Sequence, residues 1–486
     1  MPIERVSAND ATTLATDRGP APMNIGVLLM VEGGATMPFD EVRTLLTGRI
    51  PQVRRLRQRL QTTPPGCGRA IWVDAADFEI NLHLEQITLG SQTARQGAAP
   101  GGDEGAATTE LLSTAAAFVC APLPRDRPLW AARWITGLDG DEAALVLSAH
   151  HCLADGLGGL AVLSALCDEA SPAPPSTTAA DPTAAADATR LAAASSPPFP
   201  TAAPRSSDLA IDAWRARLQG VRHLPTRVTD GAAGLRELVG ARHRPRLAER
   251  TSLNRPTGPH RRLTRVVAPV AGLVDAAHTR GCTVNDLVLC AVAGALGTVL
   301  RARGEQVAEI VASVPVSGRR SASADRLGNH TGVMSLTVPL LADPDERLRR
   351  ITTMTADRKG PVRGASSGPL GLAFRALAKV GAFQVFIDHQ RLVHTFVTNV
   401  KGPTVPWHFG GHRVTAVTPM AITPGNVGVS FDILSYAGQL VVTLVADPVI
   451  VPDQAALTAD LASELAHFSG PGRARSPEAD ARPART

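Results

Sequence analysis

Aromatic side chains are scarce in this 486-residue chain, at 3% of residues with a single tyrosine. Domains that bind single-stranded nucleic acid stack bases on such side chains, so the composition argues against a nucleic-acid partner. Lysine is also scarce, and arginine carries most of the net charge of +5. This weak excess either reflects compositional bias or helps to hold anionic headgroups and phosphates, and charge alone does not decide between the two.

Cysteine is present, but without the spacing of a disulfide framework or a metal site. None of the six cysteines belongs to a C-x-x-C pair, and the chain is much longer than disulfide-stapled domains. We therefore expect free thiols and a cytoplasmic protein. The six are Cys67, Cys120, Cys152, Cys167, Cys282 and Cys290.

Long hydrophobic runs are missing as well. The N-terminal segment carries Glu4, Asp10 and Asp17 and has no apolar core, so we do not expect a secretory signal. The longest apolar run, residues 287–300, would span about 21 Å as a helix, which is shorter than a bilayer core. We expect a protein outside the bilayer, with peripheral attachment to a membrane or lipid droplet left open.

The chain is too long for one simple core, and its composition suggests where it divides. Residues 171–207 are almost entirely Ala, Pro, Ser and Thr, and are predicted to be a linker between lobes at 1–170 and 208–470. Residues 91–109 and the tail 471–486 are predicted to be unstructured. Strand and helix patterns interleave in both lobes, which predicts a two-lobed α/β or α+β fold.

One cluster of residues has the chemistry of a proton-transfer site. A continuous apolar run, Ala143–Ala149, predicts a buried strand that ends at His150 and His151. Asp155 and Gly156 follow, and a helix is predicted to begin there. Imidazole accepts a proton near neutral pH, a nearby carboxylate can hold its tautomer or its loop, and glycine permits a tight turn.

The pattern does not identify which histidine does chemistry. Adjacent residues of an extended segment point to opposite sides, so only one of His150 and His151 faces a given cavity. A metal site would need a third His or Cys at ligand spacing, and the sequence offers none nearby. Cys152 as a nucleophile has no supporting motif, and a purely structural pair of histidines remains an alternative.

Several segments together resemble a known family. His150-His151-x-x-x-Asp155-Gly156 resembles the HHxxxDG motif of the acyltransferase superfamily that includes chloramphenicol acetyltransferases and peptide-synthetase condensation domains. Further segments, in the same order along the chain, resemble motifs of the bacterial wax ester synthase/diacylglycerol acyltransferase family. They are Pro128-Leu129-Trp130, Asn285-Asp286, Val314-Pro315-Val316-Ser317, Gly328-Asn329 and Asn399-Val400-Lys401-Gly402-Pro403.

The resemblance spans nearly all of the chain outside the low-complexity segments. Two positions depart from the family pattern. Pro124 stands where the family usually has aspartate, and Lys401 where it often has proline. Neither position touches the histidine motif, so the departures put the choice of substrate in doubt and not the chemistry.

The resemblance implies a chloramphenicol-acetyltransferase-like fold, with two similar lobes and the active site between them. It also implies that His151 is a general base that deprotonates an alcohol, either diacylglycerol or a long-chain fatty alcohol, for attack on acyl-CoA. Asp155 would hold the loop and Gly156 would leave room near the thioester. The implied partners are acyl-CoA, the acceptor lipid and a membrane or lipid-inclusion surface, with no cofactor and no metal.

The remaining motif residues have supporting roles by the same resemblance. Asn285, at the start of a helix, is a candidate donor to the oxyanion. Asp286 is either part of the site or pairs with Thr283 as a helix cap. Ser317 and Asn329 are candidates for substrate binding, although a polar strand end is an equally simple interpretation of Ser317.

Pro128, Leu129 and Trp130 are the other candidates for structural support or substrate binding. Trp130 and Trp134 lie four residues apart in a predicted strand and face the same side, so we expect them in the core.

Two other functions stay open at this stage. One is a same-fold enzyme with a different acceptor or a carrier-bound acyl donor, as in condensation domains. The other is an inactive paralogue that binds lipid inclusions. The chain shows no attached carrier domain, which argues against the enzyme with a carrier-bound donor. It keeps both His151 and Asp155, which argues against the inactive paralogue.

Overall fold

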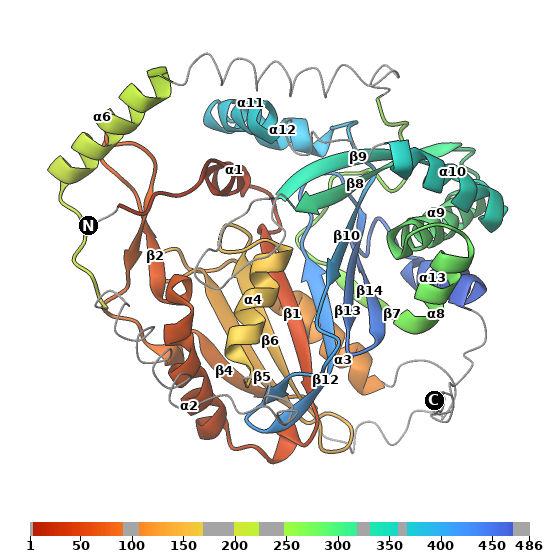
Figure 1. Cartoon of the computed structure of the whole chain (residues 1–486), viewed down its shortest axis with the longest axis horizontal. Coiled ribbons are helices and arrows are strands. Elements are labelled where there is room, and N and C mark those ends of the chain that lie inside the picture. The colour runs from red at the N-terminus through yellow and green to blue at the C-terminus, as the bar shows by residue number, and fades with distance from the viewer. Residues whose placement is uncertain are drawn as a thin grey trace, which may run out of the picture.

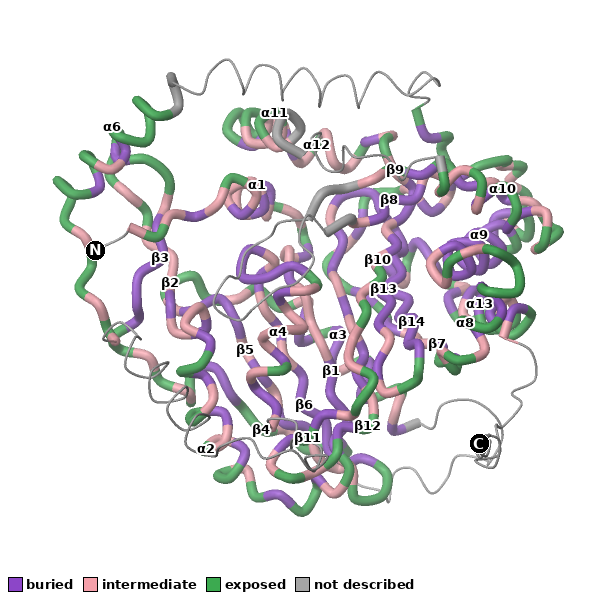
Figure 2. Tube along the Cα trace, in the orientation of Figure 1, coloured by how far each residue is buried: buried purple, intermediate pink, exposed green. Residues whose placement is uncertain are grey.

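A computed structural model of the chain describes residues 3–90, 106–168, 199–222, 247–317, 331–357 and 367–469. Two six-stranded sheets lie side by side, each with helices packed against it (Figure 1). The strands and the longest helix form the buried interior, whereas the peripheral helices are largely exposed (Figure 2). The predicted two-lobed α/β fold is confirmed.

The first sheet carries the histidine motif and has the strand order β11-β12-β1-β6-β5-β4. Successive side chains of β1 point to opposite faces of this sheet. Leu29 packs towards α2 and α4, while Leu28 packs towards α3, which also contacts β7 of the second sheet. The elements are β1 (Asn24–Val31), β4 (Leu84–Thr88), β5 (Trp130–Thr136), β6 (Ala143–His150), β11 (His408–Phe409), β12 (His412–Ala421), α2 (Phe39–Arg49), α3 (Ala106–Val119) and α4 (Gly156–Leu166).

The second sheet has the order β7-β14-β13-β10-β8-β9, with β10 parallel to both of its neighbours. Helices α8, α9, α10 and α13 pack against it, in addition to the contact of α3 with β7. The elements are β7 (Arg262–Pro269), β8 (Glu309–Ser317), β9 (Thr331–Pro339), β10 (Thr395–Lys401), β13 (Val429–Tyr436), β14 (Gln439–Ala446), α8 (Val270–Thr279), α9 (Val284–Ala302), α10 (Pro344–Asp357) and α13 (Gln454–Ser469).

Helix α9 is the core helix of the second lobe and is longer than the apolar run that predicted it. Its buried residues pack on the sheet and on α13. Within the described residues it is the one helix long and apolar enough to cross a membrane by length and composition, and 78% of that stretch is buried inside the protein. Such burial is typical of a core helix.

The lobes do not separate along the sequence as predicted. Strands β11 and β12 come from the range 208–470, yet they complete the first sheet, where Ala421 of β12 pairs with Ile25 of β1. Helix α6 (Ser206–Arg222) also belongs to the first lobe, because Leu209 packs against Ile71 and its neighbours. The range assigned to the C-terminal lobe therefore contributes to both lobes.

The predicted linker and unstructured segments are partly corrected by side-chain contacts. Thr201 donates its backbone N–H and its hydroxyl to Asp74 at 3.0 and 2.7 Å, so the end of the 171–207 segment is held on β3 (Ile71–Asp74). Helix α3 begins at Ala106, inside the 91–109 stretch. Residues 91–105, 169–198 and 470–486 lie outside the described residues.

A short helical layer covers the end of the first sheet that carries the histidines (Figure 1). It consists of α1 (Ala8–Thr16), α11 (Ser367–Lys379) and α12 (Phe383–Asp388). Thr12 donates to the carbonyl of Gly371, and Arg375 donates to the carbonyl of Ala8, so α11 is fastened on α1.

A buried carboxyl group joins the two sheets. Asp432, on β13, accepts a hydrogen bond from Thr398 of β10 at 2.9 Å and from the backbone N–H of Ala421 of β12 at 2.7 Å. Burial raises the pKa of Asp432 to about 6, although both hydrogen bonds favour the charged form. The junction between the lobes therefore contains a carboxyl group that folding favours in its neutral state.

Replacing Asp432 by asparagine should remove a pH dependence from stability. The pKa of Asp432 is raised from 3.8 to about 6 in the folded protein. Stability is therefore lost as pH rises between these values, by about 3 kcal/mol in all. Urea unfolding from about pH 4 to about pH 7 should show this loss in the wild type, relative to Asp432→Asn.

Asp77→Asn, which changes an exposed carboxylate, is the matched control and should follow the wild type. A difference between wild type and Asp432→Asn that stays constant with pH would contradict the prediction.

Candidate active site

The backbone of the first sheet delivers the two histidines to one strand end. His150 is the last residue of β6 and pairs with Asn24 of β1, while its N–H donates to the carbonyl of Leu129 at 3.0 Å. The N–H of His151 donates to the carbonyl of Met23 at 2.9 Å. Strands on both sides therefore fix the backbone of the motif.

Both ring nitrogens of His150 have hydrogen-bond partners in the wall. Nδ1 accepts the backbone N–H of Cys152 at 3.1 Å, and Nε2 lies 3.2 Å from a carboxylate oxygen of Asp17. In the neutral ring Nε2 therefore carries the proton and donates it to Asp17. The side chain is 3% exposed, so His150 is the histidine that packs in the wall.

Asp17 lies beside the histidine motif, although no local sequence pattern marks it. Besides His150, its carboxylate binds Arg125 at 2.6 Å and the backbone N–H of Met23 at 2.9 Å. Burial opposes its ionisation, but the hydrogen bonds from His150 and Met23 and the charges of His150 and Arg125 outweigh it and lower the pKa of Asp17. Asp17 thus fixes both the His150 ring and the Met23 carbonyl that binds His151.

His151 is half-buried and lies in the turn directly after β6, next to its buried neighbour. Burial has the largest effect and lowers its pKa below the ordinary value. A backbone hydrogen bond within residue 151 raises the pKa, the charge of His150 lowers it, and the charges of Asp155 and Asp10 raise it slightly. The imidazole is therefore neutral at physiological pH, which is the state that a base requires. Asp155 is the N-cap of α4, because its side chain accepts the N–H of Gly158 at 2.8 Å. This capping holds the loop after His151.

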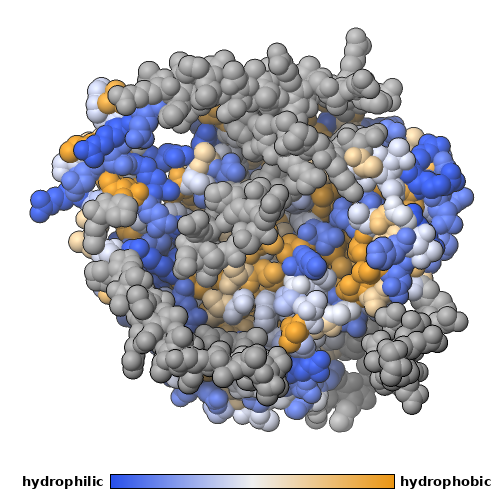
Figure 3. All heavy atoms as spheres, in the orientation of Figure 1, coloured by the Kyte–Doolittle hydropathy of each residue, from blue (hydrophilic) through white to orange (hydrophobic). Residues whose placement is uncertain are grey.

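Gly156 is the point where the motif meets the second sheet. A Cβ at this position would lie 2.8 Å from a methyl group of Val400 on β10, so a side chain would require Val400 or the loop to shift. The neighbouring Asn399 donates to the side chain of Asn285, at the start of α9, at 3.4 Å. The histidine loop, β10 and the N-terminus of α9 thus gather at the junction of the lobes. Apolar side chains near α4 are visible at the centre of the face shown in Figure 3.

Asp286 is a helix cap. Thr283 and Asp286 exchange hydrogen bonds in a capping box, and Thr355 donates to the other carboxylate oxygen at 2.8 Å. Both carboxylate oxygens of Asp286 therefore accept hydrogen bonds within the protein, and Asp286 is buried. Of the two predicted roles, capping is the one for which the structure provides contacts.

The Pro128-Leu129-Trp130 segment supports the motif from the adjacent strand. Trp130 donates its indole N–H to the carbonyl of Leu56 at 2.8 Å and stacks on His83 at 4.5 Å between ring centroids. The carbonyl of Leu129 accepts the N–H of His150. Trp130 and Trp134 belong to one buried cluster, as expected from their spacing.

Other predicted residues are less closely tied to the motif. Ser317 ends β8 opposite Thr331, and Asn329 lies outside the described residues. Lys401, which departs from the family pattern, is exposed at the end of β10. In the described part of the chain, no three His, Cys, Asp or Glu side chains cluster as a metal site would require.

Removing the Asp17 carboxylate should loosen the wall around His150. Because Asp17→Ala leaves buried donors of His150 and Met23 without an acceptor, we expect unfolding at neutral pH to become easier by about 1.5–3 kcal/mol. The pKa of Asp17 is lowered in the folded protein, so this contribution is present above the unfolded value of 3.8 and is lost at lower pH.

The measurement is urea unfolding at neutral and acidic pH. Asp275→Ala, an exposed aspartate on α8, should have little effect at either pH. Equal stabilities of Asp17→Ala and Asp275→Ala at neutral pH would argue against the proposed network.

Family models match most of the chain. The wax ester synthase/diacylglycerol acyltransferase catalytic domain matches residues 6–288, and the corresponding C-terminal domain matches residues 327–468. A Mycobacterium tuberculosis (strain ATCC 25618 / H37Rv) protein, named provisionally as a diacylglycerol O-acyltransferase, is 29% identical over 469 residues, covering 93% of this chain and 87% of the relative. A second protein of that strain, tgs1, with a similarly provisional name, is 27% identical over 452 residues, covering 91% and 90%.

Solved structures show the same fold. A wax ester synthase/diacylglycerol acyltransferase from Marinobacter aquaeolei VT8 superposes with a TM-score of 0.59 at 20% identity, covering 96% of this chain and 98% of that one. The first condensation domain of the CDA synthetase has a TM-score of 0.56 at 16% identity, with 97% of each chain covered. The expected two-lobed, chloramphenicol-acetyltransferase-like architecture is confirmed. From the family models, the chain belongs to the wax ester synthase/diacylglycerol acyltransferase family of acyltransferases.

Proposed function

We propose that this protein transfers a long-chain acyl group from acyl-CoA to the hydroxyl of diacylglycerol or of a fatty alcohol, with His151 as the general base. The observation that carries the proposal is the contrast between the two histidines. His150 uses both ring nitrogens in the wall, whereas His151 is half-buried, with a pKa that burial lowers. The names of the relatives point to a diacylglycerol acceptor.

The proposed reaction needs one base and two well-placed substrates. Neutral His151 accepts the proton of the acceptor hydroxyl while the oxygen forms a bond to the thioester carbonyl carbon. The carbon–sulfur bond then breaks, and the imidazolium returns the proton to the coenzyme A thiolate. In this scheme acyl-CoA is a co-substrate, and no covalent acyl-enzyme or further cofactor takes part.

Asn285 is our candidate for stabilising the negative charge on the carbonyl oxygen. It lies in the first turn of α9, where backbone N–H groups have no helical partner. Its side-chain oxygen accepts from Asn399, which in this assignment directs the amide –NH₂ of Asn285 away from Asn399. Asp155 and Gly156 serve the same chemistry indirectly, by capping α4 and by letting β10 approach the loop.

The first test is the release of coenzyme A thiol from palmitoyl-CoA with dipalmitoylglycerol, hexadecanol or no acceptor. Release should require an acceptor and should fall by about 10²–10⁴-fold in His151→Ala, since that is the usual contribution of a general base. The better acceptor identifies the reaction. His278→Ala, an exposed histidine of α8, is the matched control and should retain wild-type activity.

Equal release by the wild type and His151→Ala would refute the base. Product formation from an amine acceptor or a carrier-bound donor, but from neither alcohol, would refute the acceptor. Absence of ester product from every donor would favour the inactive lipid-binding paralogue.

The pH profile tests the ionisation state of the base. Because burial lowers the pKa of His151 below its ordinary value of 6.5, the neutral base persists into mildly acidic solution. We expect log kcat/KM to be flat around neutral pH and to fall only as pH drops through a value below 6.5. An activity that rises through an inflection above 6.5 would contradict this assignment.

A further inference from the structure

Helix α6 has an apolar stripe that faces solvent. Ile211, Trp214 and Leu218 lie on one side of the helix at spacings of three and four residues, and all three are exposed, with Trp214 at 61%. The opposite side is buried through Leu209 and Ala213. Figure 3 shows apolar side chains emerging among hydrophilic ones over α6, at the upper left. An amphipathic helix normally buries its apolar side, whereas α6 also exposes one.

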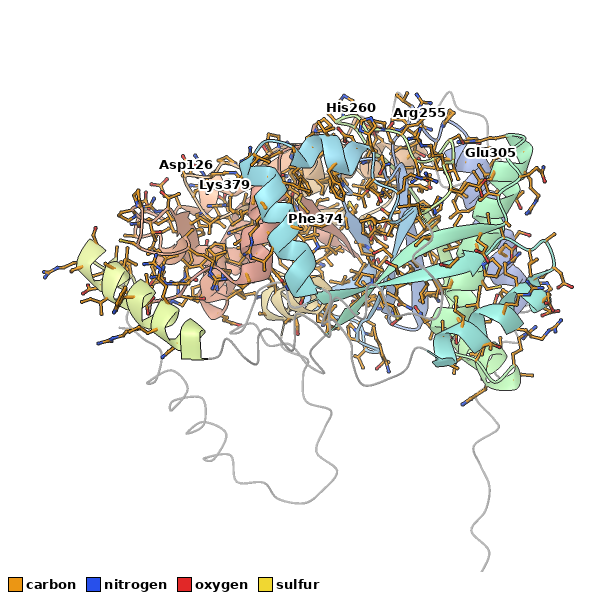
Figure 4. All side chains as sticks on the ribbon, turned by 90° about the horizontal axis from the view of Figure 1, so that it is seen from above. Asp126, Arg255, His260, Glu305, Phe374 and Lys379 are labelled. Carbon is orange, nitrogen blue, oxygen red and sulfur yellow. The ribbon has the colours of Figure 1, made fainter. Side chains whose placement is uncertain are left out.

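Helices α11 and α12 expose a second apolar surface. Leu372, Val380 and Val385 are all more than 60% exposed, and Val380, directly after α11, reaches 75%. The exposed face of α11 between Leu372 and Val380 is otherwise formed by small residues and Lys379. Figures 1 and 4 place α6 and α11 on the same side of the molecule, with Phe374 and Lys379 marking α11 in the view from above. We call the exposed side chains of Ile211, Trp214, Leu218, Leu372, Val380 and Val385 the apolar roof.

Arginine side chains accompany both parts of the apolar roof. Arg5 binds Asp212 of α6 at 2.6 Å and also donates to the carbonyl of Arg69. Burial lowers the pKa of Arg69, and the charges of Arg375 and Arg5 lower it further, so Arg69 lies in a locally positive environment. Arg215 on α6 adds an exposed positive charge beside Trp214. Such a cluster favours a neighbouring surface that is negatively charged.

The α11 part of the apolar roof lies over α1, the helix next to the histidine motif. Helix α11 rests on α1, and Asp10 of α1 lies close enough to His151 to influence its charge. One helix layer therefore separates the exposed apolar side chains from the proposed base. A lipid surface placed against α11 would lie on the side of the protein nearest to His151.

We propose that the apolar roof is the surface by which this protein docks on anionic phospholipid membranes, with Trp214 inserted at the level of the headgroups. The apolar stripe of α6 matches the interfacial region of a bilayer, where Trp is favoured, and Arg69, Arg375 and Arg215 match its negative headgroups. The proposal rests on the proposed function, because it supplies a lipid acceptor to that same site.

Trp214 is a built-in reporter for this docking. The other four tryptophans, Trp72, Trp130, Trp134 and Trp407, are at most 9% exposed. Acrylamide should therefore quench the emission of Trp214 selectively. On adding vesicles of phosphatidylcholine with phosphatidylglycerol, we expect a blue shift and protection from acrylamide. Vesicles of phosphatidylcholine alone should give a much weaker response.

Variants separate the apolar and the charged contributions while keeping Trp214. Ile211→Ser with Leu218→Ser should weaken co-sedimentation with the anionic vesicles about tenfold or more. Arg69→Gln and Arg215→Gln should each weaken it about fivefold. The matched controls are Val449→Ser and Arg349→Gln.

Both controls change exposed side chains away from α6, and they should bind as the wild type does. All six substituted side chains are on the surface, so thermal unfolding should confirm unchanged folding.

Three outcomes would overturn the proposal. They are vesicle binding without any change at Trp214, no binding to anionic vesicles, and a Trp214 shift produced by coenzyme A or by raised protein concentration alone. Thiol release from palmitoyl-CoA, measured in parallel, reports the proposed function separately. Vesicle binding without turnover would keep the docking surface and refute that function, whereas turnover without binding would do the reverse.

Discussion

The position of His151 depends on the hydrogen bonds that surround its neighbour. His150 is held by Asp17 on one nitrogen and by the Cys152 N–H on the other, and Asp17 also holds Met23, whose carbonyl binds the N–H of His151. A change in any of these contacts would turn the backbone at 151. In this arrangement the His150 ring has a structural role and helps to hold the backbone of His151.

Contacts at two positions, Gly156 and Asp432, hold the junction of the lobes. Gly156 lets β10 approach the motif, while Asp432 ties β10 and β13 to β12. The loop that contains His151 thus contacts β10 at Gly156. The two sheets are also connected through the buried carboxyl group of Asp432. Relative movement of the lobes has to break hydrogen bonds in a dry environment, where they are costly to lose.

Local spacing predicted those parts of the site that are local in the chain. The strand ending at His150, the turn at Asp155 and the capping pair around Asp286 each depend on a few neighbouring residues, and the structure contains all three elements. Asp17 acts on His150 across a large separation in sequence, and no periodicity or motif marks such a pairing. The roles of the two histidines had the same limit, because the contact of the His150 ring with Asp17 comes from a distant part of the chain.

The lobe boundary was wrong for a related reason. Linker composition marked residues 171–207, but composition and strand patterns do not show which distant strand completes a sheet, and β12 pairs with β1 of the first lobe. The exposed stripe of α6 has no signature in the sequence, because Ile211, Trp214 and Leu218 would have the same spacing on a helix that buried them. Only the exposure of each side chain distinguishes the two cases.

The placement of β12 has a consequence for how the chain acquires its structure. Strand β1 is made early and lies between β6 and β12, which come from distant parts of the sequence. During synthesis one edge of β1 therefore stays unpaired until β12 has been made and almost the whole polypeptide has left the ribosome. Contacts between such remote segments slow folding, and an open strand edge invites pairing with other chains. The two family segments are thus consecutive in sequence but share the first sheet, and a nascent chain lacking its last third would be prone to aggregate.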